Sequence, residues 1–512
     1  MSYRVLNSRM NGRFTIAGLR STQERDACRC CLADGGTGDS YEDAKPQKGS
    51  NHWSVTENYR GTARHVNFNN GSTNNNNKYN SNVVRPVAAF VGIVPLPFLD
   101  SVWDAYHDCL RGKMTSSQAI EYMTIADADI PCLAYELWTG IYQPGTSTCF
   151  LVRYPKWREV FAANFRDRIV HHWVCLRLEP LFEERFISLG DLSFNCRKGY
   201  GTEKAVDHVA EAMRRISDNY NREAWVFRGD LVGFFMSIDK DLLWYLLQRF
   251  ILRWHKRYER EGWRRIHPDI LVRLKLVAMP DMYWDILLRT TRTIVMHHPE
   301  RDCILNSPVA WWANLTSNKS LFTSPTGEPI GNLTTQLFAN FLMSFFIAYV
   351  TYLYRRQNWD MAQFVDDFVI ICDDLRFLTD SIPLMESFLR DKLKLQMHRD
   401  KRYLQPVAHG VLFVGTFIKP SRKYLSNRVV SRMSEHCYGF NRLLSDVGCS
   451  ESTLQHIEQV LNSYMGFCRR RKTYTFRLLL IDSMGESFWR CFYVKGHYDS
   501  VRLKRRYRTF NI

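Results

Sequence analysis

The sequence lacks the features of a secreted or membrane-spanning protein. Its 14 cysteines are scattered over 512 residues without the paired spacing of a disulfide framework, and a chain of this length does not need such staples. We identify no stretch of about 20 apolar residues able to cross a bilayer. The apolar run 87–99 is short, contains Pro95 and Pro97, and lies too far from the start to act as a signal peptide. These absences predict a reduced, cytoplasmic protein with no membrane partner.

Acidic residues are too few to balance the basic ones. Lysine and arginine total 69 against 52 aspartate and glutamate residues, which gives a formal net charge of +17. Such an excess suits a polyanionic partner, because contacts with phosphates release condensed counterions. A nucleic-acid-binding protein, a basic membrane-surface protein and a ribosome-associated protein all share this balance. The charge therefore indicates a class of partner and no particular chemistry.

The chain divides unevenly along its length. Residues 1–90 show little aliphatic periodicity, and asparagine makes up nine of the 18 residues from His65 to Asn82. This composition predicts a polar leader that is flexible or of low complexity. Helical patterns begin after Phe98, over residues 100–111 and 116–125. An apolar centre with strand-like runs follows, and the C-terminal part is helical and basic.

Two strand-like runs carry carboxylates. Residues 224–235 contain Asp230, and residues 361–372 predict a hairpin with Asp366 and Asp367 at its tip. Carboxylates between apolar strands are costly to bury alone, and Mg²⁺ bound by one or two carboxylates plus substrate phosphates offsets that cost. Two ions about 3.5–4 Å apart would activate a primer 3′-hydroxyl and hold a triphosphate. An acidic turn beside an unrelated acidic strand end is the alternative that these residues leave open.

Four segments, in chain order, resemble the motifs of reverse transcriptases. Residues 230–239 resemble the first palm motif, 327–340 the nucleotide-pocket motif, 364–367 (Phe-Val-Asp-Asp) the Tyr-x-Asp-Asp box, and 410–418 the primer grip. The order and spacing of the four agree with the family. The resemblance implies an α+β right-hand polymerase fold, with an antiparallel palm sheet backed by helices and a helical thumb. It implies an RNA-directed DNA polymerase.

The resemblance also implies roles for individual residues. Asp230, Asp366 and Asp367, with Leu231, would hold two Mg²⁺ ions, for which Mn²⁺ can substitute. The nucleotide would be bound by Lys156, Arg158, Phe235, Ile330, Gly331, Gln336 and Lys401. Template and primer would be bound by Arg197, Lys198, Gly415, Arg469 and Arg470. A purely structural Phe235 and solvated basic faces are the alternatives for these groups.

The same resemblance predicts five segments. They are a leader over 1–90, fingers and the start of the palm over 91–240, a largely helical insertion over 241–325, a palm over 326–420 with nucleotide pocket, Asp-Asp hairpin and primer grip, and a helical basic thumb and tail over 421–512. Apolar residues at helical spacing over 457–467 support the last of these.

Departures from the general pattern point to particular subfamilies. Ile330 stands where most retroviral and group II intron enzymes have glutamine, and Gln336 ends the motif. This combination resembles the enzymes of diversity-generating retroelements and of antiphage defence. An amide can orient a nucleotide by hydrogen bonding, whereas isoleucine can only pack, so loosened discrimination opposite template adenine is implied. Asparagine codons begin with two adenines, so the leader fits an origin from a template repeat; an Asn-rich linker is the alternative.

Three functions follow from these observations. The first is an adenine-mutagenic reverse transcriptase that uses deoxynucleoside triphosphates and a template RNA. The family resemblance, and no feature of the sequence itself, implies a small basic accessory protein as its partner. The second is a defence reverse transcriptase that copies a dedicated non-coding RNA or acts without a conventional template. The third is a maturase-like RNA-binding protein that does not polymerise. The three aspartates count against the third, because a pure binder has no reason to place carboxylates beside phosphates.

Overall fold

The computed structural model describes residues 94–507, apart from 154–155, 262–269, 271–282, 316–319 and 446–448, together with three strands between residues 51 and 77. The chain forms two compact units, each built from two segments. Unit 1 consists of Met1–Arg185 and Phe235–Leu342, and unit 2 of Phe186–Phe234 and Met343–Ile512. The predicted division into five segments stays a prediction.

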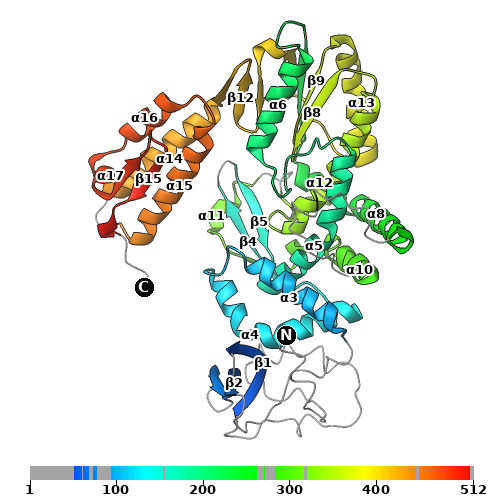
Figure 1. Ribbon diagram of the computed structural model, residues 1–512, viewed down its shortest axis with the longest axis vertical. Coiled ribbons are helices and arrows are strands. Elements are labelled where there is room, and N and C mark those ends of the chain that lie inside the picture. The colour runs from blue at the N-terminus through cyan, green and yellow to red at the C-terminus, as the bar shows by residue number, and fades with distance from the viewer. Residues whose placement is uncertain are drawn as a thin grey trace. The chain divides into compact units, whose positions relative to one another are not determined.

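Unit 1 combines helices with a small mixed sheet (Figure 1). Its helices are α3 (Leu96–Leu110), α4 (Ser117–Thr139), α5 (Phe165–Ser188), α7 (Phe234–Ser237), α8 (Lys240–Glu261), α10 (Trp284–Val295), the short η3 (Pro299–Arg301), α11 (Val309–Trp312) and the start of α12 (Leu333–Leu353). In the sheet, β4 (Ser147–Val152) pairs antiparallel with β5 (Arg158–Ala162) and parallel with β7 (Cys303–Leu305). The insertion predicted over 241–325 is therefore helical in α8, α10 and α11, with one short strand.

The two helices predicted after Phe98 are confirmed as α3 and α4. Helix α4 begins after Ser116, whose hydroxyl accepts a hydrogen bond from the Ala119 N–H at 3.4 Å. It ends at Gly140, whose φ of 84° is the left-handed conformation typical of a C-terminal cap. The prediction ended this helix at residue 125, too early, because the polar–apolar pattern blurs where the helix becomes buried on several sides.

Three antiparallel strands form within the predicted leader: β1 (Asn51–Tyr59), β2 (Thr62–Asn67) and β3 (Thr73–Asn77), in the order β1-β2-β3. The segment expected to be flexible or of low complexity thus contains a small antiparallel sheet. Ladder hydrogen bonds join backbone groups, so a strand rich in asparagine can pair despite its low intrinsic preference for strands. Residues 1–50, 60–61, 68–72 and 78–90 of the leader lie outside the described residues.

The central sheet of unit 2 is antiparallel, with strand order β10-β6-β9-β8. Its strands are β6 (Trp225–Asp230), β8 (Trp359–Phe364), β9 (Asp367–Cys372) and β10 (Tyr403–Pro406). Helix α6 (Thr202–Ile216) covers one face of this sheet (Figure 1). The apolar stripe that it buries there includes Val206 and Val209. On the other face, the Phe368 ring lies 6.1 Å from Phe227 and 4.9 Å from Phe346 of α12. The sheet is thus apolar on both faces, and α13 (Leu375–Leu393) follows it in the chain.

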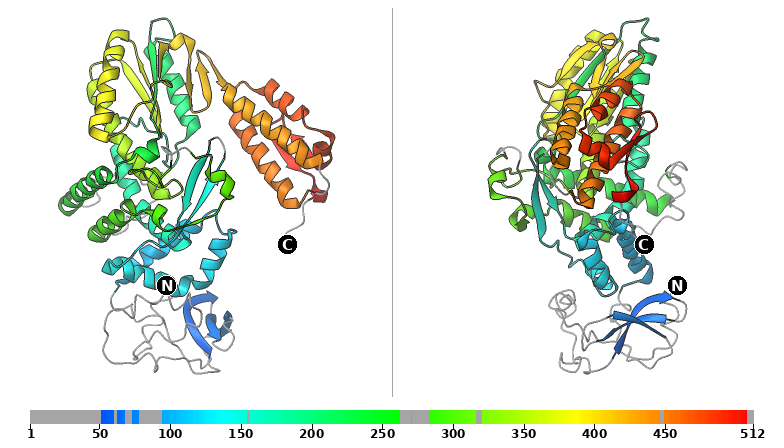
Figure 2. Two further views of the ribbon diagram at one scale, coloured as in Figure 1. Left: turned by 180° about the vertical axis from the view of Figure 1, so that it is seen from behind. Right: turned by 90° about the vertical axis from the view of Figure 1, so that its left-hand side faces the viewer.

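The rest of unit 2 is a short sheet followed by a mainly helical region (Figure 2). The sheet contains β11 (Val411–Phe413), β12 (Thr416–Lys419) and β13 (Arg422–Leu425), after the short η5 (Val407–His409). The helical region contains α14 (Asn427–Ser445), α15 (Glu451–Arg469), α16 (Tyr474–Asp482), α17 (Glu486–Cys491), the antiparallel pair β14 (Phe492–Lys495) and β15 (Ser500–Leu503), and η6 (Arg505–Tyr507). Ile457, Leu461 and Met465 of α15 are fully buried in its core, which confirms the predicted amphipathic helix.

Helix α12 corrects one expectation from the sequence. Its 21 residues are long and apolar enough to cross a membrane by length and composition, although we expected no such segment. However, 72% of its most apolar window is buried inside the protein. A core helix that is buried on most sides has the same composition as a membrane span, so this helix is weak evidence for a membrane.

Candidate active site

Asp230 and Asp367 lie directly opposite each other on neighbouring strands. Strands β6 and β9 are antiparallel, and their register pairs Asp230 with Asp367 and Arg228 with Val369. Because side chains alternate along a strand, Val226, Arg228 and Asp230 share the sheet face that α6 covers. This face is apolar beneath the helix and carries the carboxylates at the strand ends.

Asp366 lies in the two-residue turn between β8 and β9. Phe364 pairs with Asp367, which leaves Val365 and Asp366 as the turn residues. The predicted hairpin is confirmed, but its tip lies one residue earlier than predicted, because Asp367 is already the first residue of β9. Val365 has a φ of 58°, which is rare for a β-branched residue, whereas Asp366 lies outside the left-handed region. Positive φ at the first turn residue alone is the pattern of a type II′ turn. A backbone strain of about 1–3 kcal/mol is therefore held next to Asp366.

Gln363, which the sequence analysis missed, holds this turn in place. Its side chain is fully buried and donates from Nε2 to the Val365 carbonyl at 2.7 Å. Its Oε1 accepts a hydrogen bond from the Ser193 hydroxyl at 2.7 Å. Its backbone also bonds to Leu192 and Phe194. The segment from Leu192 to Phe194, which leads to the predicted template-binding residues Arg197 and Lys198, is thus attached to the strand that leads into the turn.

Two cationic side chains contact the carboxylates. Arg228 donates from Nη2 at 2.7 Å and Nε at 3.2 Å to Oδ1 of Asp367, and Lys401 donates to Oδ2 of Asp230. Burial raises the pKa of Asp367, and Arg228 opposes this rise without cancelling it. Burial alone would lower the pKa of Arg228, but its pairing with Asp367 outweighs burial and raises it. Arg228 was not predicted; its place two residues before Asp230, on the same strand face, was the available signal.

These residues fit a divalent-ion site in part. Asp230 and Asp366 present carboxylates at a strand end and in the adjoining turn, whereas Arg228 contacts Asp367. Within the described part of the chain, no three histidine, cysteine or carboxylate side chains are grouped so as to hold a metal ion. Leu231 is buried and pairs with Met397 in an isolated bridge. The structure therefore does not assemble the predicted ligands into one set, and Asp230 and Asp366 are the residues that would hold Mg²⁺.

Three predicted nucleotide-binding residues, Phe235, Ile330 and Gly331, lie in unit 1 around the loop before α12. The Glu328 N–H donates to the Phe235 carbonyl at 2.8 Å, and the Ile330 carbonyl accepts from the Phe161 N–H at 2.7 Å. Gly331 has a φ of 130°, and a Cβ there would lie 2.4 Å from the Phe161 carbonyl oxygen. Only glycine fits this position without moving backbone.

The strand predicted over 224–235 ends at Asp230. Phe234 and Phe235 lie instead on the short helix α7, where Phe234 is buried and Phe235 half-buried. Successive helical residues point about 100° apart, so one ring packs inside while the other reaches the surface. The two adjacent rings therefore differ in burial, and the one assigned to nucleotide binding, Phe235, is the more exposed.

The remaining predicted nucleotide-binding side chains differ in environment. Lys156, Arg158 and Gln336 are exposed, and Lys401 is 43% exposed while it contacts Asp230. Ile330 packs against an apolar cluster formed by Cys149, Phe161, Met236 and Leu321. An isoleucine in this cluster offers no hydrogen bond to a nucleotide.

Arg197 is one predicted template-binding residue that needs correction. Its guanidinium is buried, donates to the Ser193 carbonyl at 2.5 Å and to Asp191 at 2.6 Å, and lies 3.8 Å from the Tyr200 ring centre. Because the guanidinium N–H groups bond to Ser193 and Asp191 of the same loop, the Arg197 side chain stabilises the loop and does not extend toward a template. The neighbouring Lys198 is exposed.

The other predicted template and primer residues occupy accessible or turn positions. Arg469 and Arg470 are exposed at the end of α15. Gly415 has a φ of 78° in the turn between β11 and β12. The next arginine, Arg471, is buried instead, donating to Thr416 at 2.7 and 2.9 Å and to Glu203 at 2.8 Å.

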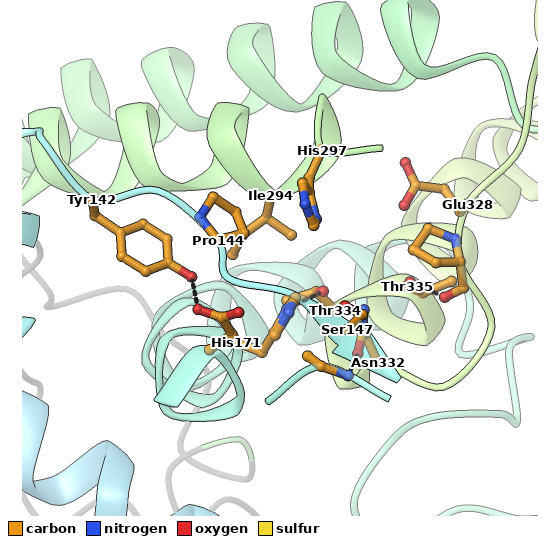
Figure 3. Close-up of a pocket in the computed structure, with 13 residues that line it drawn as sticks. Tyr142, Pro144, Ser147, His171, Ile294, His297, Glu328, Asn332, Thr334 and Thr335 are labelled. Carbon is orange, nitrogen blue, oxygen red and sulfur yellow. Dashed lines mark hydrogen bonds between the residues drawn. The ribbon is translucent and has the colours of Figure 1, made fainter. Parts of the chain in front are cut away.

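A small polar cavity lies beside the loop before α12, lined by Ser147, His171, His297, Glu328 and Asn332 among others (Figure 3). The centre of a water molecule can move within only about 10 Å³ of this cavity, so the cavity holds about one water molecule. It is far too small for a nucleotide. The Glu328 side chain is 2% exposed, and its Oε1 has no hydrogen-bond partner in the described structure. Burial raises the pKa of Glu328 to about 8, although Lys240 opposes the rise.

Comparison with known proteins gives distant similarities. No family model matches the sequence. Protein YkfC of Escherichia coli (strain K12) is 22% identical over 343 residues, which cover 60% of this chain and 76% of that protein. Apo telomerase from Candida tropicalis aligns with 70% of this chain at a TM-score of 0.39 and 12% identity. Telomerase from Candida albicans, in complex with the TWJ fragment of telomeric RNA, aligns with 67% of this chain at a TM-score of 0.39 and 11% identity. The chain spans 64% and 60% of the length of these two telomerase chains.

Proposed function

We propose that this protein is an RNA-directed DNA polymerase that makes cDNA by two-metal phosphoryl transfer. One observation carries the proposal: Asp230 and the Asp366–Asp367 turn lie on directly paired antiparallel strands. When bound, Mg²⁺ ions would activate the primer hydroxyl and neutralise charge on the transferred phosphate. The resemblance of four segments to reverse transcriptase motifs supports the same activity. So does the net charge of +17, because a template–primer duplex is a polyanion.

Each part of the chain has a role in this proposal. Asp230 and Asp366 hold the ions, and Lys401, beside Asp230, contacts the triphosphate or the leaving pyrophosphate. The sheet β10-β6-β9-β8 is the palm of a right-hand polymerase, and α14–α17 form its thumb. Phe235 on α7 excludes a 2′-hydroxyl and so favours deoxynucleotides.

A more specific role is an adenine-mutagenic enzyme of a diversity-generating retroelement. Ile330 supports this role, because its apolar packing leaves no amide to orient the incoming nucleotide. The asparagine-rich leader supports it through its adenine-rich codons. In this role the protein acts in the cytoplasm with a template RNA, deoxynucleoside triphosphates and a small basic accessory protein. A defence enzyme that copies a dedicated RNA would use the same aspartates.

Deep sequencing of cDNA from cells that carry the native locus tests the proposal. The comparison is between wild type, an Asp366→Ala, Asp367→Ala double variant, and Asp380→Ala as a control, an exposed aspartate on α13. We expect cDNA from wild type and control, none from the double variant, and errors concentrated at template adenines. Accurate, repetitive or template-free DNA that still depends on the aspartates would favour the defence role. DNA synthesis that survives the double substitution would refute the polymerase activity.

A further inference from the structure

We infer that the exposed face of the β14–β15 ribbon binds unpaired RNA. This ribbon face consists of Tyr493, Lys495 and Arg502, and none of the three belongs to a segment that resembles a reverse transcriptase motif. The Tyr493 ring stacks on a base, and the two cations contact the flanking phosphates. The choice of RNA as the ligand rests on the proposed function, because a template is unpaired until it is copied.

The inner face of the ribbon is fixed against the helical region of unit 2. Phe492, Val501 and Leu503 are no more than 2% exposed and pack in its core. Strand β15 lies beside α15 (Figure 1), where the Asn462 side chain donates to the Val501 carbonyl and accepts from the Val501 N–H, both at 2.9 Å. Since side chains alternate along a strand, the residues between the buried ones point away from this core. The ribbon is therefore a held platform with one accessible face.

The accessible face carries one aromatic ring beside two cations. Tyr493 is 46% exposed, the Arg502 side chain is 50% exposed, and Lys495 is exposed. Arg502 lies directly opposite Tyr493, and Lys495 follows Tyr493 on the same strand face, roughly 7 Å along. Arg502 is 3.8 Å from Glu458, which is too long for a hydrogen bond, so its guanidinium keeps donors for a ligand.

A tryptophan and further cations adjoin one end of this platform. Helix α17 directly precedes β14 and carries Trp489, which is 36% exposed, and the exposed Arg490. The short η6 follows β15 and carries the exposed Arg505 and Arg506. The Arg506 guanidinium donates to the Arg490 carbonyl at 2.8 Å, which holds η6 beside the end of α17. The basic and aromatic surface therefore continues beyond the ribbon face itself.

The chemistry of this surface favours a single-stranded nucleic acid. Residues 486–507 contain six lysine and arginine residues against two acidic ones, and one of these acids, Asp499, is paired with Arg477 at 2.5 Å. Exposed aromatic rings among cations are typical of proteins that bind single strands, because bases stack on the rings while cations follow the phosphates. A duplex hides the faces of its bases, so stacking requires unpaired nucleotides. The aliphatic side chains of the ribbon point into the core, which leaves little apolar area for insertion into a membrane.

Fluorescence anisotropy of fluorescein-labelled octauridylate with the full chain tests this inference. A blunt RNA–DNA hybrid in excess occupies the sites that bind duplex, so that the signal reports the binding of single strands. Tyr493→Ala should weaken binding by about tenfold, because stacking on one base is lost, whereas Tyr493→Phe keeps the ring and should bind like wild type. Arg502→Gln should weaken binding and reduce the slope of log affinity against log salt by about 0.7, the value for one phosphate contact on a single strand.

The matched controls are an exposed tyrosine and an exposed arginine elsewhere in unit 2. Tyr352 on α12 is 64% exposed, and Arg390 lies exposed on α13. Tyr352→Ala and Arg390→Gln should both bind octauridylate like wild type. Equal affinities of Tyr493→Ala and Tyr352→Ala would overturn the inference, as would an unchanged salt slope in Arg502→Gln.

Two other ligands complete the test. Tighter binding of octadeoxythymidylate than of octauridylate would overturn the choice of RNA. Tyr493-dependent binding to vesicles of phosphatidylcholine and phosphatidylserine, without binding of octauridylate, would identify a membrane surface and overturn the inference. If cDNA synthesis depends on the aspartates but octauridylate binding is insensitive to Tyr493, only the role of the ribbon face falls. If the expected binding pattern holds while DNA synthesis survives the Asp366→Ala, Asp367→Ala substitution, the polymerase proposal falls and the ribbon face stands as an RNA-binding surface.

Discussion

Replacing Glu328 by glutamine should stabilise the protein in alkaline solution. Burial raises the pKa of this carboxyl from 4.5 to about 8, against the opposing effect of Lys240. The folded state therefore holds the proton more tightly than the unfolded chain does. The stability that this adds is fully present below about pH 4.5 and is lost as the pH rises to about 8. Glutamine keeps the shape of the neutral acid and has no proton to lose.

The size of the effect is clearest between pH 6.5 and 8. His171 acts in the opposite direction at lower pH, because burial lowers its pKa from 6.5 to about 3 and stability is lost as the pH falls below 6.5. The two effects oppose each other between pH 4.5 and 6.5. Above that range, of these two groups only Glu328 changes the free energy of unfolding with pH, and it does so by about 1.4 kcal/mol per pH unit. Raising the pH by about 1.5 units, from 6.5 to 8, should therefore lower the unfolding free energy by about 2 kcal/mol.

Urea unfolding at pH 6.5 and pH 8, followed by tryptophan fluorescence, measures this difference. Between the two pH values, wild type should lose about 2 kcal/mol more unfolding free energy than Glu328→Gln. Glu121→Gln changes an exposed glutamate on α4 and should behave like wild type. Equal pH dependence in all three proteins would refute the conclusion that Glu328 is neutral when folded.

Four further substitutions test the roles of individual residues. Phe235→Ala should admit ribonucleotides in primer extension, and unchanged sugar selectivity would remove the proposed gate. Gly331→Ala places a Cβ 2.4 Å from the Phe161 carbonyl oxygen, so a cost of about 1–3 kcal/mol and a higher KM for deoxynucleotides are expected, measured by melting and steady-state kinetics. Arg471→Ala should destabilise the fold by about 3 kcal/mol, because its guanidinium is buried, whereas the exposed Arg470→Ala should only weaken RNA binding in a filter assay. Equal melting temperatures for these two variants would contradict that division.

The hairpin that carries Asp366 and Asp367 could be predicted because its local signals agree with its tertiary setting. In the run 361–372, apolar residues that favour strands flank an acidic pair, and such a pair is compatible with a tight turn. The strand around Asp230 was also found, but its end was not. Residues 231–235 remain apolar and aromatic, and nothing in their pattern separates the last strand residue from the start of α7. The preference of a short segment is decided by packing, which a local pattern does not contain.

The environments of single basic residues could not be predicted. Arg469, Arg470 and Arg471 are consecutive and chemically identical, yet two are exposed and the third is buried. The partners of the buried one, Glu203 and Thr416, lie 268 and 55 residues away in the chain. The same problem made Arg197 look like a template contact. A charge run shows that a region is basic, but only distant partners decide which of its members reach a ligand.

The two adjacent aspartates of the turn are oriented by different forces. Asp367 is the first residue of β9, so the register with Asp230 and the alternation of the strand direct its side chain toward Arg228. Asp366 precedes the strand, and its direction depends on the left-handed Val365 and on the hydrogen bond from Gln363 to the Val365 carbonyl. Strain in the turn can therefore position one carboxylate while the sheet fixes the other. Two neighbouring residues of the same type are therefore held by different means, Asp366 by the geometry of the turn and Asp367 by the strand register and its contact with Arg228.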